Sequence, residues 1–128
     1  MDNINPKKKV LIVDDDLDLQ NIIQSALDLE GYEVIVADNG KEALDILNNQ
    51  EGENKVSCII LDLMMPVMDG TTMLNLLRGD PRFSKIPVII STAKGVVDQK
   101  NIDNSQAVIK KPMKIDQLYD TVKKHTTH

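Results

Sequence analysis

The sequence predicts an α/β protein in which one parallel β-sheet lies between two layers of helices. Two observations carry this prediction: five short apolar runs, and between them longer segments whose apolar residues recur every three or four positions. Runs that are apolar at consecutive positions indicate strands covered on both faces, as in a parallel sheet. The regular alternation of strand and helix predicts right-handed crossovers, and therefore a three-layer, doubly wound sandwich.

The predicted strands are short and rich in valine and isoleucine. They cover Val10–Val13, Val34–Ala37, Cys58–Leu61, Val88–Ile90 and Ala107–Ile109. With five strands the expected order in the sheet is 2-1-3-4-5, the flavodoxin-like arrangement. The single cysteine, Cys58, lies in one of these apolar runs, so we expect it to be a small core residue.

The predicted helices each present one apolar stripe. These stripes run through Leu19–Leu27, Ala43–Leu47, Met73–Leu77 and Ile115–Val122. Asn39-Gly40 and Asp69 are start signals for the second and third helices. The stretch Gly95–Ile102 carries few apolar residues, so we expect a short, frayed fourth helix there.

Length and composition are those of one globular domain. The chain has 128 residues, of which 41% are apolar and 27% charged, enough to bury a core without disulfides or a structural metal. We expect a single domain over residues 1–128, with a core of about residues 7–124 and short disordered termini that include His125 and His128.

The charge and the N-terminus bear on partners and location. The net charge of −5 indicates no nucleic-acid and no anionic-membrane partner. The N-terminal residues lack the apolar segment of a signal peptide, and no later apolar run reaches membrane-spanning length. We therefore expect a cytoplasmic protein that is a monomer or a weak dimer.

Polar residues follow four of the predicted strands directly. They are Asp14-Asp15-Asp16 after the first, Asp62 after the third, Ser91-Thr92 after the fourth and Lys110-Lys111-Pro112 after the fifth. Ligands of such sheets bind at the carboxyl ends of the strands, near the point where the strand order reverses. All four groups are therefore expected in one crevice.

The residue types in this crevice indicate metal-assisted phosphoryl chemistry. Converging carboxylates raise each other's pKa, a conflict that a divalent cation removes. Oxygen ligands without histidine or cysteine favour Mg²⁺, with Mn²⁺ as a substitute. A lysine and a threonine suit phosphoryl oxygens, and a carboxylate can itself be the nucleophile. The residues alone leave the source of the phosphoryl group open.

Four segments resemble the receiver domains of bacterial two-component response regulators. They are Leu11–Asp15, Leu61–Gly70, Pro87–Ala93 and Ile109–Pro112, and they stand in that family's order. The resemblance extends over about residues 7–124 and implies a CheY-like, single-domain signalling module that is not an enzyme with an external substrate. It also implies a phosphoryl donor, which is a phosphohistidine of a sensor histidine kinase or of a phosphotransfer domain.

The resemblance further implies a role for each site residue. Asp62 is the phosphoacceptor, and Mg²⁺ is held by Asp14, Asp15, Asp62 and the backbone carbonyl of Met64. Thr92 is the switch hydroxyl, which hydrogen-bonds a phosphoryl oxygen. Lys111 pairs with the carboxylate or the phosphoryl group of Asp62, and the Lys111–Pro112 peptide bond is expected to be cis.

Some neighbouring residues compete for one role. Asp16 is assigned to capping the first helix, since that helix begins there. Side chains alternate across a strand, so only one of the two lysines, and only one of the two hydroxyl residues, should enter the site. The resemblance to the family implies that these are Lys111, which precedes the proline, and Thr92, which precedes an alanine. Gly70 is expected to provide the backbone angles of a sharp turn.

Three departures from the family pattern concern the output of the signal. Val108 stands where receivers usually carry Tyr or Phe, and Met113 stands where Phe is frequent. The span from Thr92 to Lys111 is also shorter than usual. The unknown output partner is expected on the face of helix 4, strand 5 and helix 5, but an aromatic relay to that face is in doubt.

Two other classes of function stay open. A phosphatase with an aspartyl-phosphate intermediate commonly needs a second acid two residues after the nucleophile, where this chain has Met64. A receiver-like binding module, unphosphorylated or flavin-binding, would leave the acidic crevice unused. The sequence is also consistent with a stand-alone receiver or with a fragment of a hybrid kinase.

Overall fold

The chain folds as five strands and five helices in strict alternation. This computed structural model describes residues 7–50, 55–93, 95 and 97–126. In chain order the elements are β1 (Lys9–Val13), α1 (Leu17–Leu29), β2 (Glu33–Ala37), α2 (Gly40–Asn48), β3 (Val56–Leu61), α3 (Gly70–Gly79), β4 (Val88–Thr92), α4 (Gln99–Asp103), β5 (Ala107–Lys110) and α5 (Ile115–Thr126).

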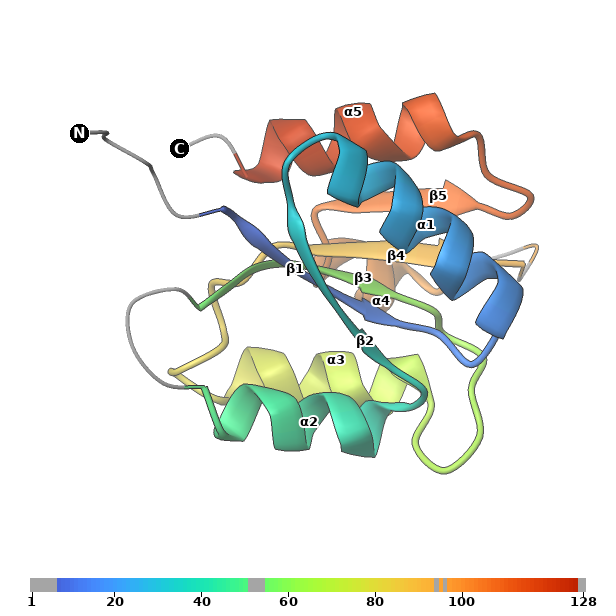
Figure 1. Cartoon of the computed structure of the whole chain (residues 1–128). Coiled ribbons are helices and arrows are strands. Elements are labelled where there is room, and N and C mark those ends of the chain that lie inside the picture. Colours follow the sequence, from blue (N-terminus) through green and yellow to red (C-terminus); the bar gives the residue numbers. More distant parts are fainter. Residues whose placement is uncertain (1–6, 51–54, 94, 96, 127–128) are drawn as a thin grey trace.

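The strands form one parallel sheet in the order β2-β1-β3-β4-β5, which confirms the predicted fold and strand order (Figure 1). All five strands are slightly longer than predicted, and two of them, β4 and β5, run further at their carboxyl ends. Ser91 and Thr92 lie inside β4 and Lys110 inside β5, because the pairs Ser91–Ile109 and Thr92–Lys110 continue the sheet. The polar residues of these two strands are therefore held by the sheet itself and not by a loop.

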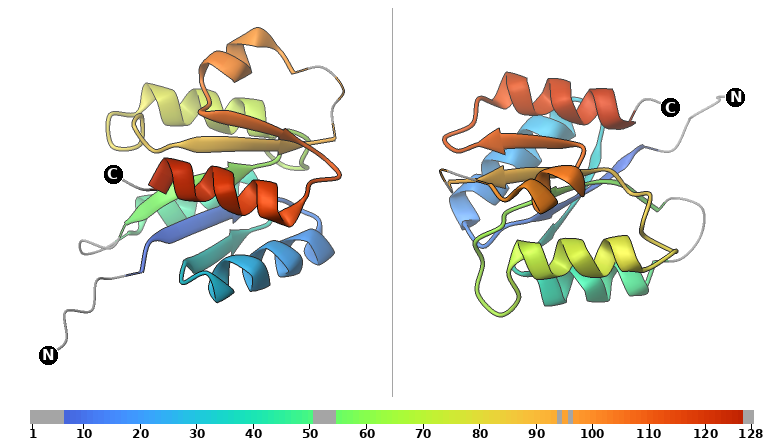
Figure 2. Two further views of the ribbon diagram at one scale, coloured as in Figure 1. Left: turned by 90° about the horizontal axis from the view of Figure 1, so that it is seen from above. Right: turned by 180° about the vertical axis from the view of Figure 1, so that it is seen from behind.

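Helices cover both faces of the sheet (Figures 1 and 2). Leu11 and Val13 of β1 pack on the face covered by α2 and α3, and Val10 and Ile12 pack on the face covered by α1 and α5. Each strand thus contributes to two aliphatic cores, as the consecutive apolar residues predicted. Cys58 belongs to the second core, where burial raises the pKa of its thiol to about 12.

Three helices begin at predicted caps. The side chain of Asp16 accepts a hydrogen bond from Leu19 N at 3.2 Å, which confirms its assignment to helix capping. Asn39 and Asp69 cap α2 and α3 in the same way, at 2.9 and 2.8 Å. These caps fix where the loops after β1, β2 and β3 end.

The fourth helix differs from its predicted bounds. It begins at Gln99, four residues later than expected, and spans only five residues. The preceding chain is held differently: the carbonyl of Gly95 accepts a hydrogen bond from Lys110 Nζ at 2.9 Å, and Val97 packs against the core. The helix is attached by Asn101, a buried residue whose amide nitrogen lies 3.0 Å from Thr71 Oγ1 of α3.

The C-terminal helix also runs further than expected. His125, expected in a disordered tail, lies within α5, while His128 is outside the described residues. The helix continues because Thr126 is buried, and its hydroxyl lies 3.0 Å from the Tyr32 hydroxyl and donates to the carbonyl of Val122. In the described part of the chain, every helix is too short or too polar to cross a membrane.

Arg78 organises the end of the sheet opposite the predicted crevice. Its guanidinium donates to the carbonyl oxygens of Asn104, Ser84 and Ile86 at 2.8–3.0 Å, and to the side chain of Gln106 at 3.1 Å. One side chain of α3 therefore holds the loop before β4 and the loop before β5.

Replacing Arg78 should destabilise the fold. In Arg78→Met, three backbone carbonyls and the Gln106 side chain each lose the hydrogen bond from Arg78, so the free energy of unfolding should fall by about 2 kcal/mol in chemical denaturation. The exposed Lys85 provides the control, and Lys85→Met should change the free energy by less than about 0.5 kcal/mol. Equal losses in the two variants would contradict this account.

Candidate functional site

Three predicted site residues meet at the carboxyl edge of the sheet. Asp14 follows β1, Asp62 follows β3 and Lys111 follows β5. The ammonium of Lys111 lies 2.8 Å from Asp14 Oδ2 and 3.2 Å from Asp62 Oδ2. Both carboxylates are buried, so one cation serves two desolvated anions.

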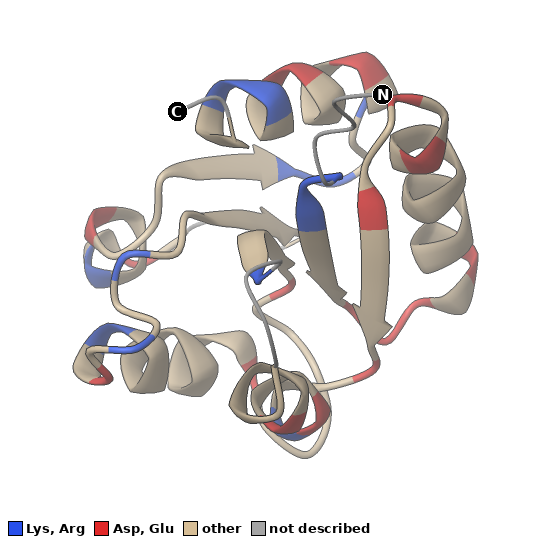
Figure 3. Cartoon of the chain, turned by 60° about the vertical axis from the view of Figure 1, so that its left-hand side comes forward, with Lys and Arg blue, Asp and Glu red and all other residues tan. Residues whose placement is uncertain are grey.

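Asp15 completes an acidic cluster with these two carboxylates. Acidic residues are spread over several helices and loops of the chain (Figure 3). Among them, one oxygen from each of Asp14, Asp15 and Asp62 lies within 4.8 Å of the others, and Asp15 is exposed. A group of hard oxygen donors with one exposed member suits Mg²⁺, which takes one or two carboxylates and keeps several waters. The chemistry of the donor set therefore fits the expected metal.

The backbone around Asp62 is fixed by hydrogen bonds to the end of β1 and within the loop that follows Asp62. Asp62 N donates to the carbonyl of Val13 at 2.9 Å, and Asp62 Oδ1 accepts from Met64 N at 3.1 Å. Gly70 N closes the following loop onto the carbonyl of Leu63 at 3.0 Å. One carboxylate oxygen of Asp62, Oδ1, is thus engaged by its own loop, whereas the other, Oδ2, accepts a hydrogen bond from Lys111.

Gly70 is needed for a different reason from the one predicted. The positive backbone angle of this loop belongs to Val67, with φ of 68°, and not to Gly70. A Cβ atom at Gly70 would overlap the backbone of Asp62 and Leu63. The glycine therefore lets α3 start directly against the strand end that carries Asp62.

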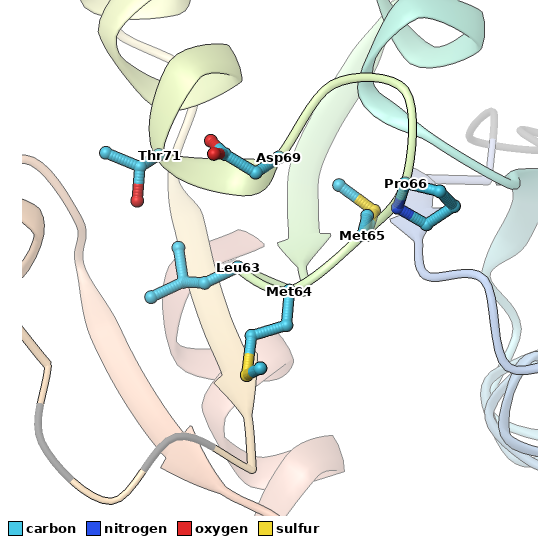
Figure 4. A pocket seen from close by; sticks show the side chains of 6 residues that line it. All are labelled: Leu63, Met64, Met65, Pro66, Asp69 and Thr71. Atoms are coloured by element: carbon cyan, nitrogen blue, oxygen red, sulfur yellow. The ribbon is translucent and has the colours of Figure 1, made fainter.

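Val67 sits at the centre of a three-residue turn in the same loop. Met68 N donates to the carbonyl of Pro66 at 2.7 Å, and a positive φ at a β-branched residue is strained. The loop and the start of α3 line an open hollow of about 560 Å³ (Figure 4). The side chain of Met64 is 61% exposed at this hollow, so it does not pack in the core.

The two neighbouring lysines at the end of β5 take different partners, whereas the two hydroxyl residues of β4 are not distinguished by burial. Lys111 reaches the carboxylates, whereas Lys110 reaches the carbonyl of Gly95, and the Lys111–Pro112 bond is cis as expected. Thr92 and Ser91 are both buried. Among the described residues, Ser91 Oγ has no hydrogen-bond partner. The role of Thr92 as the switch hydroxyl stays a prediction.

Comparison with known proteins identifies the family. The family model of the response regulator receiver domain matches residues 10–123. This chain is a receiver domain. It is 41% identical over 93 residues to a probable transcriptional regulator, ycf27, of Porphyra purpurea, and 39% identical over 87 residues to the transcriptional regulatory protein CpxR of Escherichia coli. These matches cover 73% and 68% of the receiver but only 35% and 34% of the relatives.

Solved structures agree with the receiver fold. The receiver domain of Francisella response regulator 1452 superposes with a TM-score of 0.80 at 32% identity and covers 94% of this chain and 97% of its own. The response regulator TrrA of Thermotoga maritima, solved in complex with Mg²⁺–BeF, gives a TM-score of 0.80 at 27% identity and covers 91% and 97%. The predicted membership of the family and the fold are thus confirmed.

One residue of this receiver's site was missed by the sequence analysis. Gln20 of α1 is buried, and its amide nitrogen donates to the backbone carbonyl of Asp14 and to Asp38 Oδ1, the latter at 2.8 Å. A signal was present, because Gln20, Ile23 and Leu27 follow the spacing of one buried helical face. A polar residue on such a face needs a polar partner.

The protonation of the site reflects its crowding. Burial raises the pKa of Asp62, and Asp14 raises it further, against the opposing effects of the Met64 N–H and of Lys111. For Lys111, burial alone would lower the pKa, but the hydrogen bond and charge of Asp14, together with Asp62, raise it. Lys111 therefore stays a cation, whereas ionisation of the buried Asp62 lowers the free energy of unfolding.

The raised pKa of Asp62 predicts that, without metal, Asp62→Asn is more stable than the wild type by an amount that depends on pH. Because the folded-state pKa is raised, ionisation of Asp62 destabilises the protein as the pH rises through that pKa. The melting temperature of the variant should therefore exceed that of the wild type by a few degrees at pH 7, and the two should converge in acid. A variant that is equally less stable at both pH values would contradict the assigned strain.

Proposed function

We propose that this receiver accepts a phosphoryl group on Asp62 from a phosphohistidine of a histidine kinase or a phosphotransfer domain. The observation that carries the proposal is the Lys111 ammonium, shared between Asp62 and Asp14 beside a third carboxylate. This arrangement places a buried carboxylate oxygen next to a cation that can pair with a phosphoryl oxygen once the group is attached to Asp62. A cytoplasmic location is part of the same proposal.

Magnesium is the metal that the donor set favours. Asp14, Asp15, Asp62 and the backbone carbonyl of Met64 would hold it, with Asp14 directly or through water, and Mn²⁺ would substitute. When bound, the ion supplies positive charge that offsets the converging carboxylates and the phosphoryl oxygens.

The residues of the chain divide the transfer between them. A carboxylate oxygen of Asp62 forms the new O–P bond as the P–N bond of the donor breaks, and the imidazole, protonated on its other nitrogen, leaves as neutral histidine. The ammonium of Lys111 pairs with a phosphoryl oxygen, and the hydroxyl of Thr92 donates to another. The protein takes part in its own modification and turns over no external substrate.

The output of the signal is proposed on the face formed by α4, β5 and α5. Val108 is half-buried and packs against the core on the side of α2 and α3. Its side chain is small, so it offers no large ring that could rotate. The matches cover 35% and 34% of the two transcriptional regulators, which are therefore about twice as long as this chain, so an output through a further domain and one through a separate partner are both compatible with this receiver. We propose that the receiver itself binds no nucleic acid and is a monomer or weak dimer.

A phosphatase has less support. Met64, two residues after Asp62, is exposed and brings no acid to the site. Sustained release of inorganic phosphate from a small phosphate ester, lost in Asp62→Asn, would establish this second function.

The phosphoacceptor is tested with acetyl phosphate and Mg²⁺. Mass spectrometry should find one added phosphoryl group on the wild type and none on Asp62→Asn, because only the wild type carries the nucleophile. Asp45→Asn, a change of the same type at an exposed residue of α2, should react like the wild type. An unmodified wild type, or a modified Asp62→Asn, would refute the assignment.

A matched pair of variants tests the choice between neighbouring hydroxyls. Thr92→Ala should slow modification by about tenfold or more, since a donor to the phosphoryl oxygen is lost. Ser91→Ala should leave the rate within about twofold, because Ser91 Oγ has no partner among the described residues. Rates are measured by following modified protein over time, and a slower reaction in Ser91→Ala alone would reverse the roles.

A further inference from the structure

Gln20 joins the ends of two neighbouring strands. Its carboxamide nitrogen donates to the carbonyl oxygen of Asp14, at the end of β1, and to the carboxylate of Asp38, which follows β2, at 2.8 Å. Gln20 is only 5% exposed, whereas Asp38 is exposed. A buried amide on α1 therefore connects the acidic loop after β1 to the loop before α2.

The chemistry of the two partners fixes how this amide is turned. A carbonyl and a carboxylate are acceptors only, so the nitrogen of Gln20, and not its oxygen, must face them. Each of the two N–H groups then has one acceptor. A glutamate here would meet two acceptors without a donor, and a methionine of similar length would leave the Asp14 carbonyl without its donor.

This contact completes the restraint of Asp14. Asp14 N donates to the carbonyl of Ala37 at 3.1 Å, and Asp14 Oδ1 accepts from Asp16 N at 2.9 Å. The carbonyl held by Gln20 belongs to the peptide bond that leads into Asp15. Rotation of that peptide would move Asp15, which is the exposed member of the acidic cluster.

Gln20 also restrains the loop without adding charge. The amide is neutral, so it adds no charge to a cluster in which Lys111 pairs with Asp14 and Asp62. A cation in this position would hold the same carbonyl but would compete with a metal for the acidic cluster.

We propose that Gln20 is a positioning residue for metal binding, which orients the Asp14–Asp15 peptide through its contact to Asp14. The proposal rests on the proposed Mg²⁺ site. Partners that orient metal ligands typically affect metal affinity by tenfold or more when they are removed. Gln20 does not touch the metal or the phosphoryl group in this account.

The test compares Gln20→Met with Gln24→Met, a change of the same type one turn later at a half-buried position of α1. Calorimetric titration with MgCl₂ should give a dissociation constant about tenfold higher for Gln20→Met and unchanged for Gln24→Met. At saturating Mg²⁺, the extent of modification by acetyl phosphate should return to that of the wild type. An unchanged dissociation constant in Gln20→Met, at a temperature where it is folded, would overturn the proposal.

Asp38 offers a second test at an exposed position. Asp38→Ala removes one acceptor of Gln20, while Asp38→Asn removes the same charge but keeps an acceptor oxygen. Magnesium affinity should therefore be weaker in Asp38→Ala than in Asp38→Asn. Equal affinities in the two variants would show that the hydrogen bond between Gln20 and residue 38 does not affect metal binding, against the proposal.

A metal-free measurement separates this inference from the proposed function. Hydrogen exchange of the amides of residues 14–16, without Mg²⁺, should be faster in Gln20→Met than in the wild type and Gln24→Met. If the wild type binds no Mg²⁺, the proposed function fails, and the exchange rates alone decide whether Gln20 orders this loop. Unchanged exchange at these amides would overturn the positioning role in either case.

Discussion

The interaction on which the rest of the site depends is the ammonium of Lys111 held between two buried carboxylates. Asp14 and Asp62 end neighbouring strands, β1 and β3, so the sheet brings their charges together whether or not a cation is present. Lys111 comes from β5, two strands away from β3. The parallel order of the strands brings together these residues, which are 97 positions apart in the sequence.

The loops around this ion pair are arranged for access and not for maximal stability. Gly70 allows α3 to begin against the backbone of Asp62, and Val67 holds a positive φ in an exposed turn. Burial raises the pKa of Asp62, so its ionised form is destabilising by itself. Such a carboxylate gains most from an added cation, which connects the strain of the site to its proposed chemistry.

Much of the site was predictable because it depends on strand ends. Consecutive apolar residues mark the strands, and the parallel order then brings Asp14, Asp62 and Lys111 together. The family pattern favoured Lys111 over Lys110, and in the structure Lys111 contacts Asp62 whereas Lys110 contacts the carbonyl of Gly95. The capping role of Asp16 followed from its place before an apolar helical stripe.

What escaped prediction depends on contacts between distant residues. The burial of Gln20 could be read from its place on the buried face of α1, but its partner Asp38 could not, and Arg78 looks like a solvated residue of α3 until the loops that it holds are in place. The bounds of α4 were wrong because Gly95 and Val97 are engaged by β5 and by the core, which no local pattern reveals. The reason for Gly70 was also wrong, since a close approach of two backbones leaves no mark in the sequence.

The central claim is that the ammonium of Lys111 exchanges the Asp62 oxygen for an oxygen of the phosphoryl group when that group is added to Asp62. The most direct measurement is a crystal structure of the protein with Mg²⁺ and beryllofluoride. It should show the beryllium on an oxygen of Asp62, the metal beside Asp15, and Lys111 Nζ paired with a fluoride in place of the Asp62 oxygen. A structure in which Asp62 carries no adduct, and Lys111 keeps both carboxylates under saturating conditions, would contradict the account.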